Sequence, residues 1–330
     1  MGNTLFLIAG TIATTAFAVI TGLVFLGIDR IFVARMQARV GPPLSQPFFD
    51  FFKLMSKENV IPRDAIAWLF NLAPILALAS SFVLMLYIPI GSWQPLLASQ
   101  GDLILIVYLL IVPALAMVIG GFASSSPYAT IGAQREMVTM ISYELPLATI
   151  AVAYAWKLNA AGIDHPFALS SITANPIWGL VGPVGLGGVA LLLLALTIVT
   201  PGELSRIPFD TPEAETELAG GLLVEYSGRN FALFYLALGV KSLVMSGLVV
   251  ALFLPWNISH FISMPTPVAR IADLIFWLFK IELVIFVAAS LIRISVARFR
   301  INHVVALYWK YLGVVGFLGL ALLMIDSVIK

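Results

Sequence analysis

Residues 103–122 read "LILIVYLLIVPALAMVIGGF", twenty positions without a charged side chain. About twenty consecutive apolar residues form a helix long enough to cross a hydrocarbon core of about 30 Å, and such a run is far too long for a strand of a membrane β-barrel. Similar runs recur along the chain, so the sequence predicts an all-α, polytopic membrane protein with about eight transmembrane helices. The other expected spans are 4–28, 65–90, 137–158, 178–200, 231–254, 271–292 and 304–326.

The composition of the whole chain agrees with a protein embedded in lipid. Of its 330 residues, 61% are hydrophobic and 11% are charged, whereas soluble domains carry roughly a quarter charged residues. We expect a single transmembrane domain over residues 1–330. The first run is expected to be a retained helix, because it lacks the basic start and the small-residue cleavage site of a signal peptide. The net charge of +1 gives no bulk attraction for nucleic acid.

No cofactor or metal is expected on this chain. Cysteine is absent, and the three histidines, His165, His260 and His303, are scattered along the sequence. Iron–sulfur and structural metal sites need clustered thiolates or imidazoles. Any redox centre would therefore belong to a partner protein.

The distribution of basic residues predicts which side of the membrane each connection faces. An even number of spans places both termini on the same side, and cytoplasmic loops carry an excess of Lys and Arg. The connections away from the basic side, together with the termini, hold only Lys157, Arg270 and Lys330. We therefore expect both termini to lie outside a cytoplasmic membrane. The connections expected to face the cytoplasm are 29–64, 123–136, 201–230 and 293–303.

The connection 29–64 is too long for a tight turn and contains "QPFFDFFKLMSKENVIP" at 46–62. Its phenylalanines alternate closely with Asp50, Lys53 and Lys57, which favours an amphipathic helix lying in the membrane interface. A loop helix packed on the spans explains the pattern equally well. Under either interpretation this connection is a cytoplasmic docking surface.

Ionisable residues inside the expected spans are candidates for function, because a charge near the bilayer centre costs about 3 kcal/mol on insertion scales. Glu144 lies about two turns into the fourth span, with Pro146 just beyond it. Lys241 lies midway along the sixth span, and Lys280 and Glu282 lie midway along the seventh. Lys280 and Glu282 are two residues apart and point to different faces, so each needs a partner elsewhere. A buried structural ion pair is the alternative role for these residues.

Charges are densest in "RIPFDTPEAETELAGGLLVEYSGRN" at 206–230. Asp210 or Thr211 is expected to cap a helix that begins near Pro212, since acids are favourable in a first turn, and Gly220–Gly221 is expected to end it. Helix capping does not explain every acid, because closely spaced carboxylates repel one another. In a partly dry site such carboxylates titrate near neutral pH. Together with Glu144, they predict a path for protons from a cytoplasmic loop into the membrane.

Four motifs give the chain a resemblance to the heel subunit of respiratory complex I, the subunit 1 type of NADH dehydrogenase. They are "RMQARVGPP" at 35–43, "AQREMVTMISYELPLA" at 133–148, "RIPFDTPEAETELAGGLLVEYSG" at 206–228 and "RISVARFRINHVVALYWK" at 293–310. The uninterrupted "RVGPPLSQPFFDFFKL" and "SSPYATIGAQREM" look most like the membrane subunits of energy-converting membrane-bound hydrogenase, formate hydrogenlyase and sulfane sulfur reductase. "ISYE" is shared with the quinone-reducing enzymes. A quinone-binding subunit of NADH–quinone oxidoreductase is therefore the alternative.

The resemblance implies a non-redox anchor and coupling subunit of an ion-translocating oxidoreductase complex. It implies that 29–64 and 201–230 bind a peripheral redox arm whose proteins carry iron–sulfur clusters and, in a hydrogenase, a nickel–iron site. Antiporter-like membrane subunits and the lipid bilayer are the other expected partners. Electron transfer in the arm would drive proton or sodium translocation, and a quinone would be bound only under the alternative. A free-standing transporter and a purely structural anchor are further hypotheses.

The expected coupling residues combine the family's acids with the charged residues found in the spans, namely Glu144, Asp210, Glu213, Glu215, Glu217, Glu225, Lys241, Lys280 and Glu282. The residues expected to dock the arm are Arg35, Arg39, Asp50, Lys53, Arg206, Arg298 and Arg300.

Overall fold

The fold of the chain is described by a computed structural model that covers residues 2–98, 100–262 and 264–329. Within these residues, eight helices are long and apolar enough to cross a membrane, which confirms the predicted number of spans. Apart from an isolated bridge between Ile90 and Trp93, the described chain contains no β-structure. The prediction of an all-α membrane protein is therefore correct.

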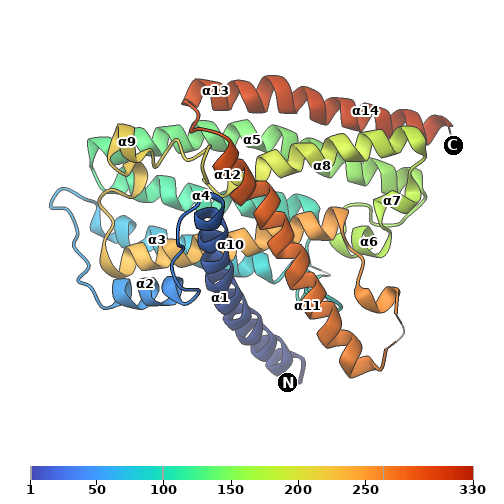
Figure 1. The fold of residues 1–330 in the computed structure, drawn as a ribbon, viewed down its shortest axis with the longest axis horizontal. Coiled ribbons are helices and arrows are strands. Elements are labelled where there is room, and N and C mark those ends of the chain that lie inside the picture. The colour runs from blue at the N-terminus through green and yellow to red at the C-terminus, as the bar shows by residue number, and fades with distance from the viewer. Residues whose placement is uncertain (1, 99, 263, 330) are drawn as a thin grey trace.

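Seven helices and one composite helix make up the spans (Figure 1). The simple ones are α1 (Gly2–Met36), α3 (Ala67–Met85), α4 (Leu103–Ala123), α5 (Pro127–Ala160), α8 (Pro183–Glu203), α10 (Gly228–Phe253) and α11 (Thr266–Ile285), which continues into α12 (Ile292–Ser295). The composite one consists of α13 (Ile301–Ala306) and α14 (Gly313–Ile329). The connections contain the shorter helices α2 (Gln46–Met55), α6 (Leu169–Ala174), α7 (Ile177–Leu180) and α9 (Glu215–Leu218), with 3-10 turns at Gly221–Leu223 and Ile258–His260.

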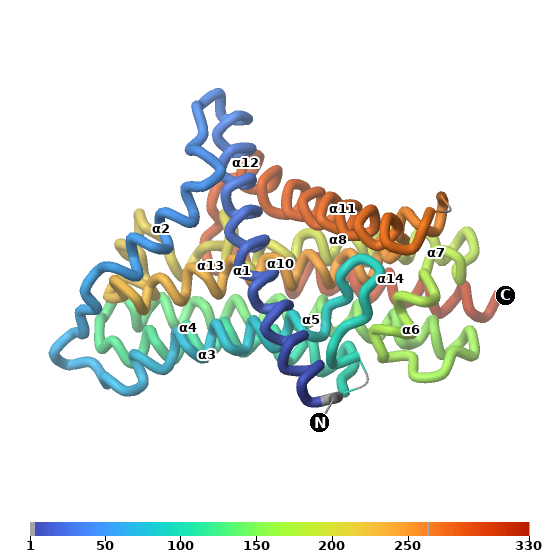
Figure 2. The backbone as a smooth tube through the Cα atoms, turned by 90° about the horizontal axis from the view of Figure 1, so that it is seen from below, coloured from blue at the N-terminus to red at the C-terminus, as the bar shows by residue number. Residues whose placement is uncertain are grey.

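The bundle is organised around α10. Its most apolar 18-residue window is 94% buried, whereas the corresponding window of every other span is at most 61% buried, so α10 is the central helix. Helices α3, α4, α5, α8 and α14 run roughly parallel to it, while α1 and α11 cross the bundle obliquely (Figures 1 and 2). We call the end that carries α2, α9 and α12 the charged end. The end with the connections 86–102, 161–182 and 254–265 is called the terminal end.

Several span boundaries differ from the prediction by three or more residues, and three of these differences extend a helix toward the charged end. Helix α1 continues to Met36 rather than ending at 28, α5 begins at Pro127 rather than 137, and α8 continues to Glu203 rather than ending at 200. The predicted connection 123–136 is consequently reduced to three residues. Hydropathy alone cannot detect these turns, because they contain charged residues whose partners come from other helices.

The stretch 206–230 does not form the helix expected to begin near Pro212. Between Pro212 and Gly220 the helical residues are Glu215–Leu218, their N-cap residue is Ala214, and the chain before them is irregular. The expected break at Gly220–Gly221 is confirmed, since Ala219, Gly220 and Gly221 all have positive φ. A Cβ atom on Gly221 would collide with the carbonyl oxygen of Pro212, so this tight turn requires glycine. The folded-back turn is held by a 3.2 Å hydrogen bond from Leu222 N to that carbonyl.

Two segments in the described part of the chain are π-helical, Phe286–Leu291 between α11 and α12, and Leu307–Leu312 between α13 and α14. Insertions of this kind in an α-helix are frequent at functional sites. Each contains a buried polar residue that interacts with a buried acid. Ser290 in the first segment donates a hydrogen bond to Asp29, and Tyr308 in the second interacts with the charge of Glu203.

Candidate functional site

A buried ion pair lies where α8 ends beside the middle of α10. Lys241 Nζ is 2.8 Å from Glu203 Oε1, and it also donates a 2.7 Å hydrogen bond to the backbone carbonyl of Glu203. Both residues are 1% exposed. Since ionised groups of this kind are costly to bury without a partner, the pair fixes the end of α8 against the central helix.

Glu136 of α5 belongs to the same site. It is 1% exposed, and its charge interacts with Lys241, Glu203 and Glu213. Ser205 Oγ lies 3.4 Å from Glu136 Oε1, a long hydrogen bond that connects α5 to the chain leaving α8. The charge of Lys241 thus acts on two buried acids, Glu203 and Glu136, and Glu136 links this pair to the loop acid Glu213.

Two tyrosines enclose the Glu203 carboxylate. Tyr143 and Tyr308 are both completely buried, their rings are 6.2 Å apart in an edge-to-face arrangement, and both interact electrostatically with Glu203. Tyr308 donates a 3.2 Å hydrogen bond to the carbonyl of Ile198, further back along α8. Two buried aromatic rings therefore form part of the surroundings of Glu203.

Glu144 lies on a different face of α5 from Glu136 and Tyr143. It is partly buried, and the residues one turn away on its face, Ile141 and Ala148, are exposed. Its charge still interacts with that of Glu203. Glu144 is therefore where the group of acids approaches the outer surface of the bundle.

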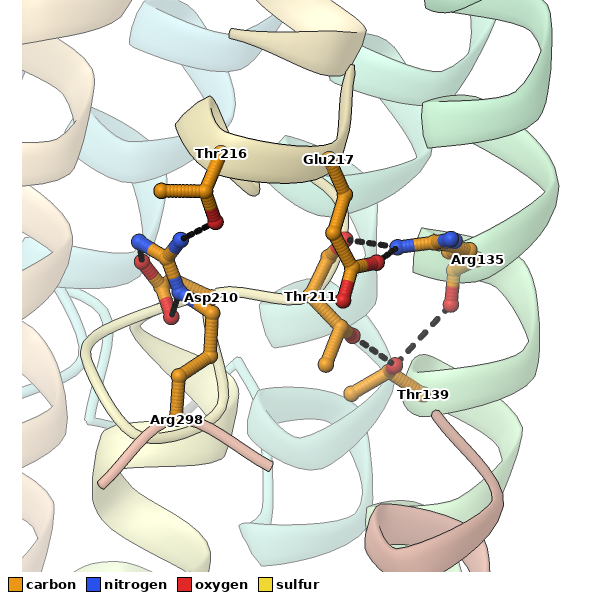
Figure 3. Close-up of polar contacts among 7 residues, drawn as sticks. All are labelled: Arg135, Thr139, Asp210, Thr211, Thr216, Glu217 and Arg298. Atoms are coloured by element: carbon orange, nitrogen blue, oxygen red, sulfur yellow. Dashed lines mark hydrogen bonds and ion pairs between the residues drawn. The ribbon is translucent and has the colours of Figure 1, made fainter. Parts of the chain in front are cut away.

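The acids of the loop before α10 divide into those that fasten the loop and those that do not (Figure 3). Asp210 accepts two hydrogen bonds from Arg298, 2.8 Å from Nε and 2.5 Å from Nη2. Glu217 accepts a 2.6 Å bond from Arg135 of α5, whose guanidinium also reaches the carbonyl of Thr211 at 3.3 Å. Asp210 and Glu217 therefore hold the loop to its neighbours.

Glu213 is the loop acid whose charge reaches the buried site. Its pKa is raised to about 7, first by burial and then by neighbouring Asp210 and Glu215, against the opposing effect of Arg206 and Arg298. This carboxyl group exchanges protons near neutral pH. Glu215 is exposed and Glu225 is partly buried.

A second group of charges surrounds Asp29 of α1, which is 3% exposed. Asp29 accepts a 2.6 Å hydrogen bond from Ser290 and a 3.3 Å bond from Arg206, and Arg293 lies 3.8 Å away. Glu282 interacts with the charge of Asp29, and neither of its buried carboxylate oxygens has a hydrogen-bond partner in the described part of the chain. Glu282 is thus near Asp29, apart from the Glu203 pair.

Lys280 faces a different part of the protein from Glu282. Its ammonium group donates to the carbonyls of Leu254 and Trp256 at 2.8 and 2.7 Å, beyond the end of α10. No ion pair joins it to Glu282 among the described residues, as expected from their spacing. Lys280 therefore lies at the terminal end and outside the group formed by Glu136, Glu203 and Lys241.

The expected docking residues fall into two sets. Three of them are used inside the chain: Asp50 accepts a 2.7 Å bond from Arg30, Arg206 contacts Asp29, and Arg298 holds Asp210. Burial alone would raise the pKa of Asp50, but hydrogen bonds from Arg30 and Gln46 outweigh it and lower the pKa. The set that remains exposed at the charged end is Arg35, Arg39, Lys53 and Arg300.

Helix α2 has one face packed against the spans and one exposed apolar face. Phe48 and Phe51 pack against a cluster formed by α1 and α10, whereas Phe49 and Phe52 are more than 60% exposed. The helix is packed on the spans through one side and leaves an apolar surface on the other.

Sequence reasoning missed the acids Asp29, Glu136 and Glu203. Each lies within three residues of the end of a predicted span, where an acid was treated as part of a loop. For Asp29 and Glu136 the signal was an acid directly next to an apolar run with no helix-stop residue between them, whereas Pro201 and Gly202 gave a false stop signal before Glu203. No group of His, Asp or Glu residues suited to hold a metal ion was found among the residues the structure describes.

Eight membrane-spanning helices around a buried lysine and several carboxylates define a polytopic subunit of the kind found in membrane-bound oxidoreductase complexes. The chain belongs to the NADH dehydrogenase subunit 1 family, whose model, described as NADH dehydrogenase, matches residues 9–324.

Relatives of known identity come from several complexes of this type. The chain is 32% identical to a subunit of the F(420)H(2) dehydrogenase of Methanosarcina mazei over 93% of this chain and 91% of the relative. It is 35% identical to hydrogenase-4 component C of Escherichia coli over 85% of each chain. Among solved structures, a chain of the membrane-bound sulfane sulfur reductase, an archaeal respiratory membrane complex, matches with a TM-score of 0.82 and 25% identity, over 98% of this chain and all of that one. The predicted resemblance is confirmed.

Proposed function

We propose that this chain is the non-redox anchor and coupling subunit of a complex I-like complex. In this function it links electron transfer in a docked peripheral arm to proton or sodium translocation in neighbouring membrane subunits. The observation that supports this most is the buried Glu203–Lys241 pair, whose charges also act on Glu136, and through Glu136 and Glu203 the loop acid Glu213 and the partly buried Glu144 are linked to it electrostatically.

In this proposal, the loop before α10 is where a change in the docked arm first acts on these acids. Glu213 titrates near neutral pH, and the loop around it is anchored by Arg298 and Arg135. A docked arm that changes the charge or position of the loop during electron transfer would change the charge of Glu213. Because Glu136 is its neighbour, the change would pass into the buried site.

In this proposal, Glu144 is where the change in charge acts on a neighbouring membrane subunit. It lies beside exposed apolar residues of α5, a surface that suits another membrane subunit. In our proposal an antiporter-like subunit covers this surface and responds to the charge of Glu144. Translocation itself would take place in that partner.

The charged end supplies the arm-docking surface. Arg35, Arg39, Lys53 and Arg300 are exposed there, and the excess of basic residues favours a cytoplasmic location for this end and an external location for both termini. Iron–sulfur clusters, and in a hydrogenase the nickel–iron site, would be carried by the docked proteins. Two of the relatives are named as hydrogenase and sulfane sulfur reductase components, which favours an arm of that type, linked to ferredoxin.

The experiment is to replace Glu203 by Gln in the assembled complex and to compare electron transfer with ion uptake in sealed vesicles. We expect the protein composition of the complex to be unchanged and the number of ions moved per electron to fall at least about tenfold, which is the effect of about 1.4 kcal/mol on a coupling constant. Glu58→Gln, which removes an exposed acid at the same end, is the matched control. An unchanged ratio of ions to electrons in the Glu203→Gln complex would refute the proposal.

A further inference from the structure

Two hollows adjoin one another at the terminal end, and neither is lined by Glu136, Glu203 or Lys241. The first is an apolar groove of 350 Å³ between the first half of α1, the end of α3 and the connection that follows. The second is a polar cavity of 160 Å³ beneath the end of α10. Trp93 and Gln94 line both hollows. Phe17 lines the groove and Trp277 the cavity, and their rings lie 6.3 Å apart, so these rings separate the two spaces.

The groove lies on the side of the bundle that faces lipid. Phe6, which lines it, is 70% exposed, and Ile275 of α11 next to it is 62% exposed. Leu96 packs directly against Gly10, and the small side chain of Ala13 leaves room in the groove one turn further along α1. An apolar surface at this place is suited to a hydrocarbon chain from the surrounding bilayer.

The cavity contains a cation and polar groups but no carboxylate among its described lining residues. Lys280, which is 5% exposed, is the cation, and Ser170, Thr173 and Asn257 contribute polar side chains. The cavity has room for on the order of ten water molecules, enough for a small anionic group.

Lys280 has an unused hydrogen-bond donor. Two of its three N–H groups donate to the carbonyls of Leu254 and Trp256, and the ammonium lies 5.0 Å from the centre of the Phe276 ring. These neutral partners leave the positive charge without an ion pair among the described residues. The charge of Asp273 also acts on Lys280, but this carboxylate accepts hydrogen bonds of 2.9 and 2.7 Å from Ser259 and forms no ion pair with Lys280 among the described residues. A buried ammonium group of this kind is stabilised by an anion that can enter the cavity.

We propose that these adjoining hollows bind one anionic phospholipid, with its phosphate on Lys280 and one acyl chain in the groove. A soluble anion would explain the cavity but not the apolar groove that continues from it past Trp93 and Gln94. A neutral amphiphile would explain the groove but not the buried cation. The lipid fastens the start of α1 to the connection between α3 and α4.

The test uses the purified complex in vesicles that contain phosphatidylglycerol with a photoactivatable group on its acyl chain. After illumination, we expect cross-links on residues 6–17 or 85–97 of this chain. Lys280→Gln should lower their yield roughly tenfold, because it removes a charge-assisted hydrogen bond, whereas Lys280→Arg should largely keep it. Lys310→Gln removes an exposed lysine at the charged end and should have no effect.

A second pair of variants tests the groove without touching the buried lysine. Ala13→Phe fills the groove and should lower the cross-linking yield by a similar factor. Ala16→Phe, at another exposed position on the same helix that does not line the groove, should leave it unchanged. Equal cross-linking in the unmodified, Lys280→Gln and Ala13→Phe complexes would overturn the proposal. Complete competition by inorganic phosphate at millimolar concentration would also overturn it, because the ligand would then be a soluble anion.

Discussion

The ion pair between Glu203 and Lys241 allows the strongest quantitative prediction. At a separation of 2.8 Å and an effective dielectric constant of about 20, the attraction of two unit charges is about 6 kcal/mol before the cost of burying them is subtracted. Removing one partner leaves the other buried and unpaired, and such changes typically cost about 3–5 kcal/mol. Each single substitution, Glu203→Gln or Lys241→Met, should therefore lower the free energy of unfolding by an amount in this range.

The local geometry predicts which substitution is milder. In Glu203→Gln, Lys241 keeps its 2.7 Å bond to the backbone carbonyl of residue 203 and the nearby charge of Glu136. In Lys241→Met, Glu136 and Glu203 repel each other with no cation between them. We therefore expect Glu203→Gln near the lower limit of the range and Lys241→Met near its upper limit.

A double-mutant cycle measures the interaction between Glu203 and Lys241. Unfolding is followed by circular dichroism in mixed micelles during titration with a denaturing detergent. The double variant Glu203→Gln/Lys241→Met should lose far less stability than the sum of the two singles, with an interaction energy of about 3 kcal/mol. Lys310→Met, at an exposed lysine, should change stability by at most about 0.5 kcal/mol. Additivity of the two single effects to within about 0.5 kcal/mol would show that the two side chains do not act as a pair.

Two further predictions concern the loop between α8 and α10. Since the pKa of Glu213 is raised to about 7, the folded protein holds a proton there that the unfolded chain releases near pH 4.5, and this contribution to stability should decline as the pH rises between those values. Glu213→Gln should flatten the dependence of unfolding free energy on pH in that interval, and an unchanged profile would contradict the assignment. Arg298→Gln removes both hydrogen bonds to Asp210 and should increase proteolytic cleavage within 205–227 several-fold, whereas Arg300→Gln, at an exposed neighbour, should not. Equal cleavage of the two variants would show that Arg298 does not restrain the loop.

The spans could be predicted from the sequence because each contains about twenty apolar residues, and nothing but a helix satisfies its backbone in lipid. Their ends could not, because the last turns toward the charged end are held by contacts between distant segments. Glu136 illustrates the difficulty: its neighbours Lys241 and Glu203 are more than sixty positions away in the sequence. Local hydropathy placed it in a loop, and only the packing of α5 against α8 and α10 shows that it is buried.

The prediction of a helix near Pro212 in the loop at 206–230 was wrong for a related reason. Capping rules assign acids to the backbone of their own helix, but Asp210 and Glu217 instead bind arginines from the segment after α12 and from α5. Glu144, selected because its sequence position lies inside a span, is buried less completely than Glu136. A count along the sequence gives the depth of a residue in the membrane, but not the direction in which its side chain points.

The length of α5 has a mechanical consequence. Thirty-four residues make a rod about 51 Å long, which exceeds the hydrocarbon thickness of about 30 Å, so the helix must tilt or project beyond it. Arg135, which grips the loop, and Glu144, which lies near the outer surface, are nine residues apart on this one rod, about 14 Å along its axis. Pro146, the interior proline, comes after both of them. Arg135 and Glu144 are therefore parts of one continuous helical segment, and a displacement of the loop held by Arg135 would also shift the backbone at Glu144.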